Sequence, residues 1–242
     1  MNVAIILAGG IGTRLGADIP KQFIKVSGKP LLVYTAEIYQ NHPLIDAIEV
    51  VCVESHIDYL NQLVDEYNLD KVKWIIPGGK DFQHSFINGI NNLKGHLNDT
   101  DIVLQQYGAS PYITPDLITD AIKVSSIHGV SSSASPCYQL YGTNDDEKSK
   151  KAIDRGSFME LNCPHAYKFS FISRLLDEAV EKDYINQVEP HTTSLIYYMG
   201  HEIYFSKGSA LNLKITNKED LDLFEAYVLM KKQKLKTQKT VS

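Results

Sequence analysis

The N-terminal stretch of the chain combines glycines and basic residues at a spacing that suits a bound polyphosphate. The apolar run from Val3 to Leu7 leads directly into a glycine-rich segment, residues 8–16. Glycine lets the backbone turn tightly and bring its N–H groups close to a bound anion. Arg14 and Lys21 add fixed positive charge to the same stretch. The combination favours phosphate binding over a plain tight turn between a strand and a helix.

The glycine spacing separates this loop from two common nucleotide-binding loops. A Walker A loop closes its glycines with Gly-Lys-Ser or Gly-Lys-Thr, and that ending does not occur here. A dinucleotide-binding loop requires Gly-x-Gly-x-x-Gly, but Leu15 stands at the third glycine position and Gly16 follows one residue later. The segment therefore predicts a phosphate-binding loop of another kind.

The composition is that of an ordinary soluble globular protein. The 242 residues are 43% hydrophobic and 22% charged, which suits one α/β domain. The formal charge of -5 argues against a nucleic-acid binder. Three scattered cysteines form neither a disulfide nor a zinc pattern, which predicts a cytoplasmic protein without a bound structural metal. No apolar run approaches the roughly 20 residues of a membrane-spanning helix, so we predict no membrane association.

Strand-like and helix-like segments alternate along most of the chain. The segments that read as strands are Val3–Leu7, Ala47–Val53, Val72–Ile76, Asp101–Gln105 and Glu202–Ser206, and those that read as helices are 31–39, 59–67, 86–93, 117–124 and 170–182. This alternation predicts a three-layer α/β/α fold with a mainly parallel sheet. Ligands of such sheets bind beyond the carboxyl ends of the strands, where the glycine-rich loop, Gly78-Gly79 and the segment after Gln105 would meet.

Two parts of the chain depart from this alternation. Between about residues 137 and 161, a polar, turn-forming run predicts a hairpin that projects from the domain. Near the C-terminus, Asn212–Thr216 reads as the end of a strand, on which Lys214 faces away from its apolar neighbours. Thr216 and Glu219 predict a capping box that opens the last helix, and residues 231–239 read as a frayed, solvated tail.

Two motifs carry a resemblance to a known enzyme family. Leu7-Ala8-Gly9-Gly10-x-Gly12-Thr13-Arg14-Leu15-Gly16 and Pro20-Lys21-Gln22-Phe23 resemble the signature of nucleotidyltransferases that make CDP-linked polyols. The family includes 4-diphosphocytidyl-2-C-methylerythritol synthase and ribitol-5-phosphate cytidylyltransferase. The resemblance implies a Rossmann-like α/β fold of the nucleotide-diphospho-sugar transferase type, with a projecting β-arm that joins a homodimer. It also implies that CTP and a polyol phosphate yield CDP-polyol and pyrophosphate, with Mg²⁺ held mainly by the CTP phosphates.

The resemblance also implies roles for individual residues. The expected catalytic cations are Arg14, Lys21 and Lys214. The expected nucleotide-binding residues are Leu7, Ala8, Gly9, Gly10, Ile11, Gly12, Gly78, Gly79 and Ser85, with the Ser85 hydroxyl at the cytosine edge. The expected acceptor-binding residues are Arg155, Tyr107, Gln139, His165, His191 and Thr192. The acceptor phosphate is largely dianionic near neutral pH, because its second pKa is about 6, so the reaction needs cations rather than a general base.

Several positions depart from the residues that the family usually carries. Tyr107 stands where the family has an aspartate near the metal, and Phe82 replaces an arginine near the base pocket. Gln139, His165 and His191 replace other family residues on the acceptor side. These changes favour a ribitol-type or other polyol phosphate over methylerythritol phosphate as acceptor. A sugar-1-phosphate nucleotidyltransferase and a catalytically silent nucleotide-binding subunit remain open alternatives.

Overall fold

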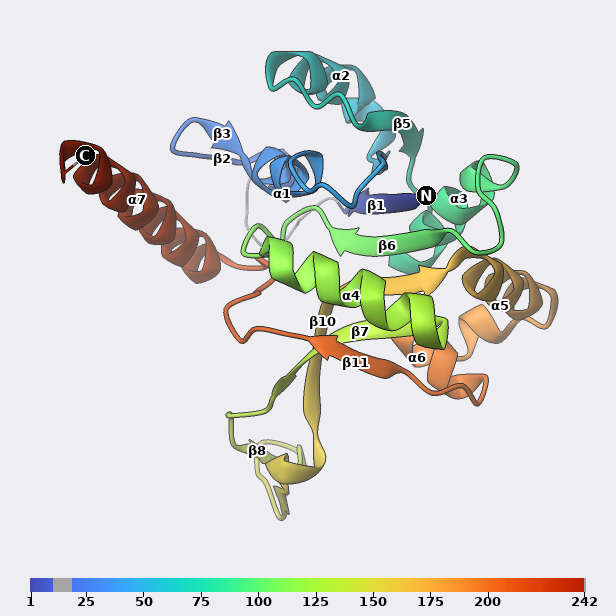
Figure 1. Ribbon diagram of the computed structural model, residues 1–242. Coiled ribbons are helices and arrows are strands. Elements are labelled where there is room, and N and C mark those ends of the chain that lie inside the picture. Colours follow the sequence, from blue (N-terminus) through green and yellow to red (C-terminus); the bar gives the residue numbers. More distant parts are fainter. Residues whose placement is uncertain (11–18, 242) are drawn as a thin grey trace.

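A seven-stranded sheet forms the centre of the computed structural model, which describes residues 1–10 and 19–241 (Figure 1). Its strands are β1 (Asn2–Ala8), β4 (Ala47–Cys52), β5 (Val72–Pro77), β6 (Ile102–Tyr107), β7 (Val130–Pro136), β10 (Met159–Lys168) and β11 (Tyr204–Lys207). They lie in the order β11-β7-β10-β6-β1-β4-β5. Strand β10 is antiparallel to both of its neighbours, and the other adjacent pairs are parallel. The predicted mainly parallel sheet is confirmed.

Helices cover both faces of this sheet because the side chains of its central strands alternate between two apolar clusters. In β1, Ala4 and Ile6 pack against α1 (Leu31–Gln40), α2 (Ile57–Glu66) and α4 (Pro115–His128). Val3 and Ile5 pack on the opposite face, against α3 (Phe82–Leu93), α5 (Phe169–Glu181) and α6 (Thr192–Tyr198). The three-layer α/β/α architecture is therefore confirmed. The short 3-10 helices are η2 (Lys21–Phe23), η3 (Glu54–His56), η4 (Arg155–Ser157) and η5 (Tyr184–Asn186).

Strand β7 was not predicted, because its sequence lacks the apolar pattern of a buried strand. It reads Val-Ser-Ser-Ser-Ala-Ser-Pro, and all four of its serines are buried. The Ser131 hydroxyl donates to the Ala121 carbonyl at 2.9 Å, and the Ser133 hydroxyl donates to the Pro164 carbonyl at 3.2 Å. Such hydrogen bonds offset the cost of burying a hydroxyl. Its neighbour β10 was also missed, and it completes the sheet beside β6.

The predicted arm projects from the body of the molecule (Figure 1). Strands β8 (Tyr141–Gly142) and β9 (Ala152–Ile153) pair in an antiparallel manner within it, and a second short pair, β2 (Lys25–Val26) and β3 (Lys29–Pro30), lies near α1. Several large apolar side chains of the arm face solvent, including Tyr138, Leu140 and Phe158. The arm therefore presents apolar surface away from the core.

The C-terminal region differs from the prediction in three respects. Residues 208–217 form an irregular segment rather than a strand end, because their backbone partners lie in loops, as when the Ile215 N–H donates to the Ala109 carbonyl at 2.8 Å. The capping box consists of Asn217 and Asp220 rather than Thr216 and Glu219.

The third difference is the length of the last helix. Helix α7 (Lys218–Val241) continues through the segment expected to be frayed and leads away from the body (Figure 1). Lysine and glutamine are strong helix formers, so this polar segment can continue the helix instead of fraying. None of the helices among the described residues combines the length and the apolar character needed to cross a membrane.

Candidate active site

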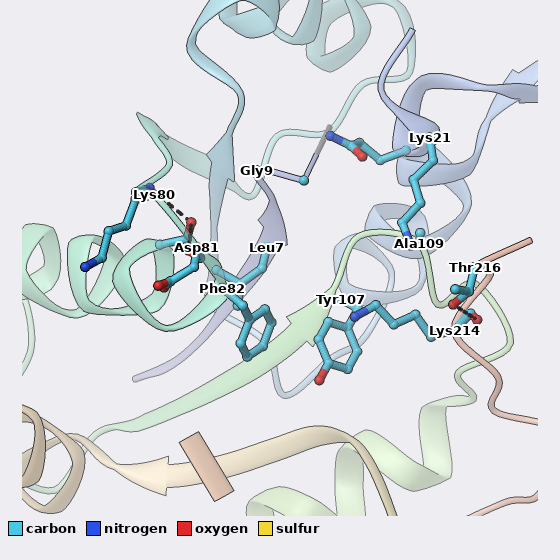
Figure 2. Close-up of a pocket in the computed structure, with 14 residues that line it drawn as sticks. Leu7, Gly9, Lys21, Lys80, Asp81, Phe82, Tyr107, Ala109, Lys214 and Thr216 are labelled. Atoms are coloured by element: carbon cyan, nitrogen blue, oxygen red, sulfur yellow. Dashed lines mark hydrogen bonds between the residues drawn. The ribbon is translucent and has the colours of Figure 1, made fainter. Parts of the chain in front are cut away.

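A pocket of about 280 Å³ lies beyond the carboxyl ends of β1 and β6 (Figure 2). Five separate parts of the chain line it: the end of β1, η2, the start of α3 with the loop before it, the end of β6, and residues 214–216. The predicted crevice at this edge of the sheet is therefore present. Among the described residues expected to bind the nucleotide, Leu7, Gly9, Gly10, Gly79 and Ser85 line the pocket.

Glycines allow two backbone loops to pack directly against each other at the pocket wall. A Cβ atom at Gly78 would lie 3.4 Å from the Gly9 Cα and 3.2 Å from the Ser85 Oγ. The Ser85 hydroxyl accepts a hydrogen bond from the Gly79 N–H at 3.0 Å and donates to the Asp81 carbonyl at 2.7 Å. Ser85 is only 4% exposed. The Ser85 hydroxyl therefore stabilises the loop before α3. The sequence did not predict this structural role.

Alanine substitutions at two pocket glycines are expected to differ in their effect on stability. At Gly79, a Cβ atom would lie 2.5 Å from the His84 Cβ, whereas at Gly10 no atom of the described residues lies within 4 Å. Gly79→Ala must displace the start of α3, at a cost of about 2 kcal/mol, and should lower the Tm by about 4–8 °C. Gly10→Ala is the matched control and should leave the Tm unchanged. Equal Tm values for the two variants in a thermal unfolding scan would contradict this packing.

Two of the three predicted cations lie in this pocket, although they are distant in sequence. The Lys21 ammonium donates to the Ile215 carbonyl at 2.8 Å, which ties η2 to the irregular segment that carries Lys214. The Lys214 Nζ lies 3.8 Å from the centroid of the Tyr107 ring. Figure 2 shows both side chains directed into the same space. The third predicted cation, Arg14, lies outside the described residues, as do the predicted nucleotide-binding residues Ile11 and Gly12.

The pocket also contains a charged pair that the sequence analysis did not select. Lys80 and Asp81 follow Gly79 at the start of α3 and both line the pocket. Figure 2 shows the Lys80 side chain pointing away from Lys21 and Lys214. The Asp81 carboxylate caps α3 by accepting from the His84 N–H at 2.8 Å. Adjacency to the predicted Gly78-Gly79 pair was the signal that would have found these two residues.

Three aromatic side chains form one wall beside Lys214. The Phe82 ring lies 5.0 Å from the Tyr107 ring and 5.1 Å from the His191 ring, measured between centroids. The Tyr107 hydroxyl lies 3.3 Å from the His191 Nδ1. Burial raises the pKa of the Tyr107 hydroxyl, and burial also lowers the pKa of His191. Near neutral pH this wall is therefore uncharged; Tyr107 lines the pocket, and His191 contacts it from behind.

The other residues expected at the acceptor site are dispersed. His165 is 6% exposed and its Nδ1 lies 2.8 Å from the Ser132 Oγ, while burial and the nearby His191 lower its pKa to about 4. Thr192 is 1% exposed and accepts a hydrogen bond from the Gln105 amide at 3.0 Å. Gln139 and Arg155 are exposed in the arm, where the Arg155 guanidinium donates to the Tyr138 carbonyl at 3.0 Å. This chain alone therefore does not gather the six residues around one cavity.

Comparisons with known proteins agree with this geometry. The family described as IspD, 2-C-methyl-D-erythritol 4-phosphate cytidylyltransferase, matches residues 2–230. A ribitol-5-phosphate cytidylyltransferase of Lacticaseibacillus paracasei is 34% identical over 94% of this chain and 98% of that protein. A 2-C-methyl-D-erythritol 4-phosphate cytidylyltransferase of Clostridium novyi is 36% identical over 93% of this chain and 95% of that protein.

Solved structures show the same fold. The crystal structure of the Francisella tularensis 2-C-methyl-D-erythritol 4-phosphate cytidylyltransferase matches with a TM-score of 0.76 at 25% identity, and the match covers 92% of this chain and 98% of that one. A crystal structure of a 4-diphosphocytidyl-2C-methyl-D-erythritol synthase matches with a TM-score of 0.77 at 18% identity, over 94% and 98% of the two chains. The resemblance of the N-terminal motifs is thus confirmed over nearly the whole chain. The chain belongs to the 2-C-methyl-D-erythritol 4-phosphate cytidylyltransferase family, and it is a nucleotidyltransferase of the cytidylyltransferase type.

Proposed function

We propose that this protein transfers a cytidylyl group from CTP to a ribitol-5-phosphate-like polyol phosphate and releases pyrophosphate. The observation that carries the proposal is the convergence of Lys21 and Lys214 on one pocket beside the glycine-rich end of β1. Relatives named ribitol-5-phosphate cytidylyltransferase occur in several bacteria, including Lacticaseibacillus paracasei and Vibrio parahaemolyticus. The changed residue His191, which lies against Tyr107 and Phe82, supports an acceptor other than methylerythritol phosphate.

The proposed chemistry needs charge compensation more than proton transfer. An oxygen of the acceptor's phosphate attacks the α-phosphorus of CTP, and the bond from that phosphorus to the departing pyrophosphate breaks. The attacking monoester is already largely dianionic near neutral pH, so no side chain has to remove a proton. Lys21 and Lys214 would offset the repulsion between the two anions and the charge that develops on the leaving group. Backbone N–H groups near Gly9 and Gly10 would contact the phosphates.

The described residues of the pocket do not form a protein-held Mg²⁺ site. Mg²⁺ prefers carboxylate and other oxygen ligands in octahedral geometry. Asp81 is the carboxylate among the described lining residues, and it already caps α3, while Tyr107 contributes a neutral ring. Within residues 1–10 and 19–241, the search for three or more clustered His, Cys, Asp or Glu side chains that could hold a metal found none. We therefore propose that Mg²⁺ enters bound to the CTP phosphates.

A pyrophosphate-release assay with a panel of substrates tests the proposal. With CTP and Mg²⁺, ribitol 5-phosphate should support faster turnover than 2-C-methyl-D-erythritol 4-phosphate. Faster turnover of 2-C-methyl-D-erythritol 4-phosphate would instead assign the protein the activity named for its Clostridium novyi relative. Activity with UTP or GTP and a sugar 1-phosphate, but not with CTP, would contradict cytidylyl transfer. Binding of CTP without turnover on any acceptor would support a silent nucleotide-binding subunit.

We further propose that the arm packs against a second copy of the chain and that Arg155 meets the acceptor phosphate there. The exposed fractions of Tyr138, Leu140 and Phe158 are 68%, 86% and 53%, which is unusual for large apolar side chains clustered in one projecting element. A partner would cover this surface. Arg155 does not line the pocket of its own chain. In a dimer it could instead reach the pocket of the second copy.

Introducing charge into the arm should disrupt the proposed dimer. Leu140→Asp is expected to shift the protein from dimer to monomer in size-exclusion chromatography with light scattering, because an aspartate cannot be buried cheaply in an apolar contact. Leu229→Asp is the matched control, since Leu229 is another exposed leucine but lies on α7. Loss of activity together with the dimer would support a shared site. A monomeric wild-type protein that is fully active would refute this part of the proposal.

A further inference from the structure

The ammonium group of Lys214 lies against the face of an aromatic ring. Its Nζ is 3.8 Å from the centroid of Tyr107 and 5.7 Å from the centroid of Phe82. A cation within about 6 Å of a ring centroid is attracted by the negative face of the ring, and the attraction weakens with distance. Tyr107 is therefore the dominant aromatic contact of Lys214, and Phe82 is a weaker one. Figure 2 shows the lysine side chain reaching from its loop to the Tyr107 ring.

Tyr107 is itself held firmly enough to serve as a fixed support. It is the last residue of β6 and stands in register with Leu7 of β1. The next residue continues this pairing, because the Gly108 N–H donates to the Leu7 carbonyl at 2.9 Å. Phe82 packs on the ring at 5.0 Å between centroids, and the hydroxyl reaches the His191 Nδ1 at 3.3 Å. The strand, the neighbouring ring and the hydroxyl contact together restrict the orientation of the Tyr107 ring.

The lysine, in contrast, begins on an irregular segment. Two contacts anchor the backbone beside it: the Thr216 hydroxyl donates to the Lys214 carbonyl at 3.0 Å, and the Ile215 N–H donates to the Ala109 carbonyl at 2.8 Å. Beyond that backbone, a lysine side chain has four flexible methylene groups. A contact at the ammonium end is therefore needed to hold the charge at one place in the pocket.

We infer that Tyr107 is a positioning residue for Lys214: its ring face holds the ammonium group in the pocket without adding a formal negative charge. An aspartate at the same position would also attract the lysine, but its charge would offset part of the lysine's charge. A neutral ring adds no such offset to the lysine's charge. Because burial raises the pKa of the Tyr107 hydroxyl, the ring carries no phenolate charge near neutral pH. The catalytic consequence rests on the proposed cytidylyl transfer, whereas the contact itself does not.

A set of variants separates the ring face from the hydroxyl. Tyr107→Phe keeps the face and should lose much less activity than Tyr107→Leu. Tyr107→Leu removes the face and should lower kcat by about 3- to 30-fold, with a smaller change in the KM for CTP. Lys214→Met combined with Tyr107→Leu should be no slower than Lys214→Met alone, because the ring then has no cation to hold. Effects that multiply in the double variant would overturn the inference, as would an equal loss in Tyr107→Phe.

Two further substitutions set the scale of these effects. Phe82→Leu should lower kcat less than Tyr107→Leu, because the Phe82 centroid is farther from the ammonium group. Tyr67→Leu is the control for loss of a tyrosine ring near a lysine, since Tyr67 faces Lys29 at 5.6 Å and does not line the pocket. It should leave kcat unchanged. A larger loss for Phe82→Leu than for Tyr107→Leu would contradict the assignment to Tyr107.

Nuclear magnetic resonance provides a readout that does not depend on turnover. The ring current of Tyr107 should shift the terminal methylene protons of Lys214 upfield in the wild type and in Tyr107→Phe, but not in Tyr107→Leu. The Lys214 signal is assigned by its absence in Lys214→Met. If the wild type turns over no acceptor but shows this shift, the proposed function fails and the contact stands. If the Lys214 signal is the same in the wild type and in Tyr107→Leu, the positioning role is refuted whatever the activity.

Discussion

Lys214→Met is expected to lower kcat for cytidylyl transfer by about 10²- to 10³-fold, the usual cost of removing one preorganised charge from a transition state. Methionine keeps the length and apolar stem of lysine but carries no charge. In the structure, the Lys214 ammonium lies against the Tyr107 ring at the pocket, and its segment is tied to η2 through the Lys21 to Ile215 hydrogen bond. The charge is thus already in position before the substrates bind, which is the condition for a large effect.

The measurement is pyrophosphate release at saturating CTP and acceptor, together with the Tm of each variant. Lys123→Met is the matched control, because Lys123 is exposed on α4 and does not line the pocket. It should change neither activity nor Tm. A Lys214→Met enzyme that keeps its Tm and remains within threefold of wild-type kcat would show that this lysine does not act on the reacting phosphates.

Glu49→Gln is expected to stabilise the protein and to remove a pH dependence from its stability. Glu49 lies on β4 and is fully buried, and its Oε1 accepts a hydrogen bond from the Asn92 amide at 2.7 Å. Its Oε2 has no hydrogen-bond partner among the described residues, and a Cβ atom at Gly89 would lie only 2.7 Å from that oxygen. Burial raises the pKa of this carboxyl from 4.5 to about 8.

The sign of the pH effect follows from where the proton is bound. Between pH 4.5 and about 8, Glu49 keeps its proton in the folded protein but loses it in the unfolded chain. The folded state then binds more protons, so the free energy of unfolding falls as the pH rises through this window. The slope is about 1.4 kcal/mol per pH unit, which amounts to about 5 kcal/mol over the whole window. Below pH 4.5, Glu49 is protonated in both states and does not lower the free energy of unfolding.

Urea unfolding at several pH values between 5 and 8 tests this expectation. Glutamine keeps the oxygen that accepts from Asn92 but has no proton to lose, so Glu49→Gln should flatten the pH dependence. At pH 7.5 it should raise the free energy of unfolding by about 2–4 kcal/mol. Glu225→Gln, on the exposed surface of α7, is the control and should leave the slope unchanged. Parallel pH profiles for the wild type and Glu49→Gln would show that this carboxyl is ionised in the folded protein.

Much of the fold and part of the site were accessible from the sequence. The apolar segments from β1 to β6, and the helices between them, have the periodicities of buried strands and amphipathic helices, so their order predicted the parallel sheet. The edge at which a parallel sheet binds ligands then follows from topology alone. Glycines and Lys21 beside β1 pointed to phosphate at that edge. The missed strand β7 shows the limit of such prediction, because serines such as Ser131 and Ser133, whose hydroxyls bond carbonyls elsewhere in the chain, are buried without an apolar pattern.

The sequence by itself determined which residue types could do the chemistry: glycines that permit close backbone approach, and lysines that offset phosphate charge. Only the tertiary structure decided which of them meet. The Lys21 to Ile215 hydrogen bond joins residues 194 positions apart. The Lys214 ammonium contacts the ring of Tyr107, which lies on a different segment. The tertiary structure also places Thr192 and His165 in the interior, and it buries Glu49 where the protonated carboxyl is favoured. Such partners are set by the packing of distant elements, which local periodicity and spacing do not record.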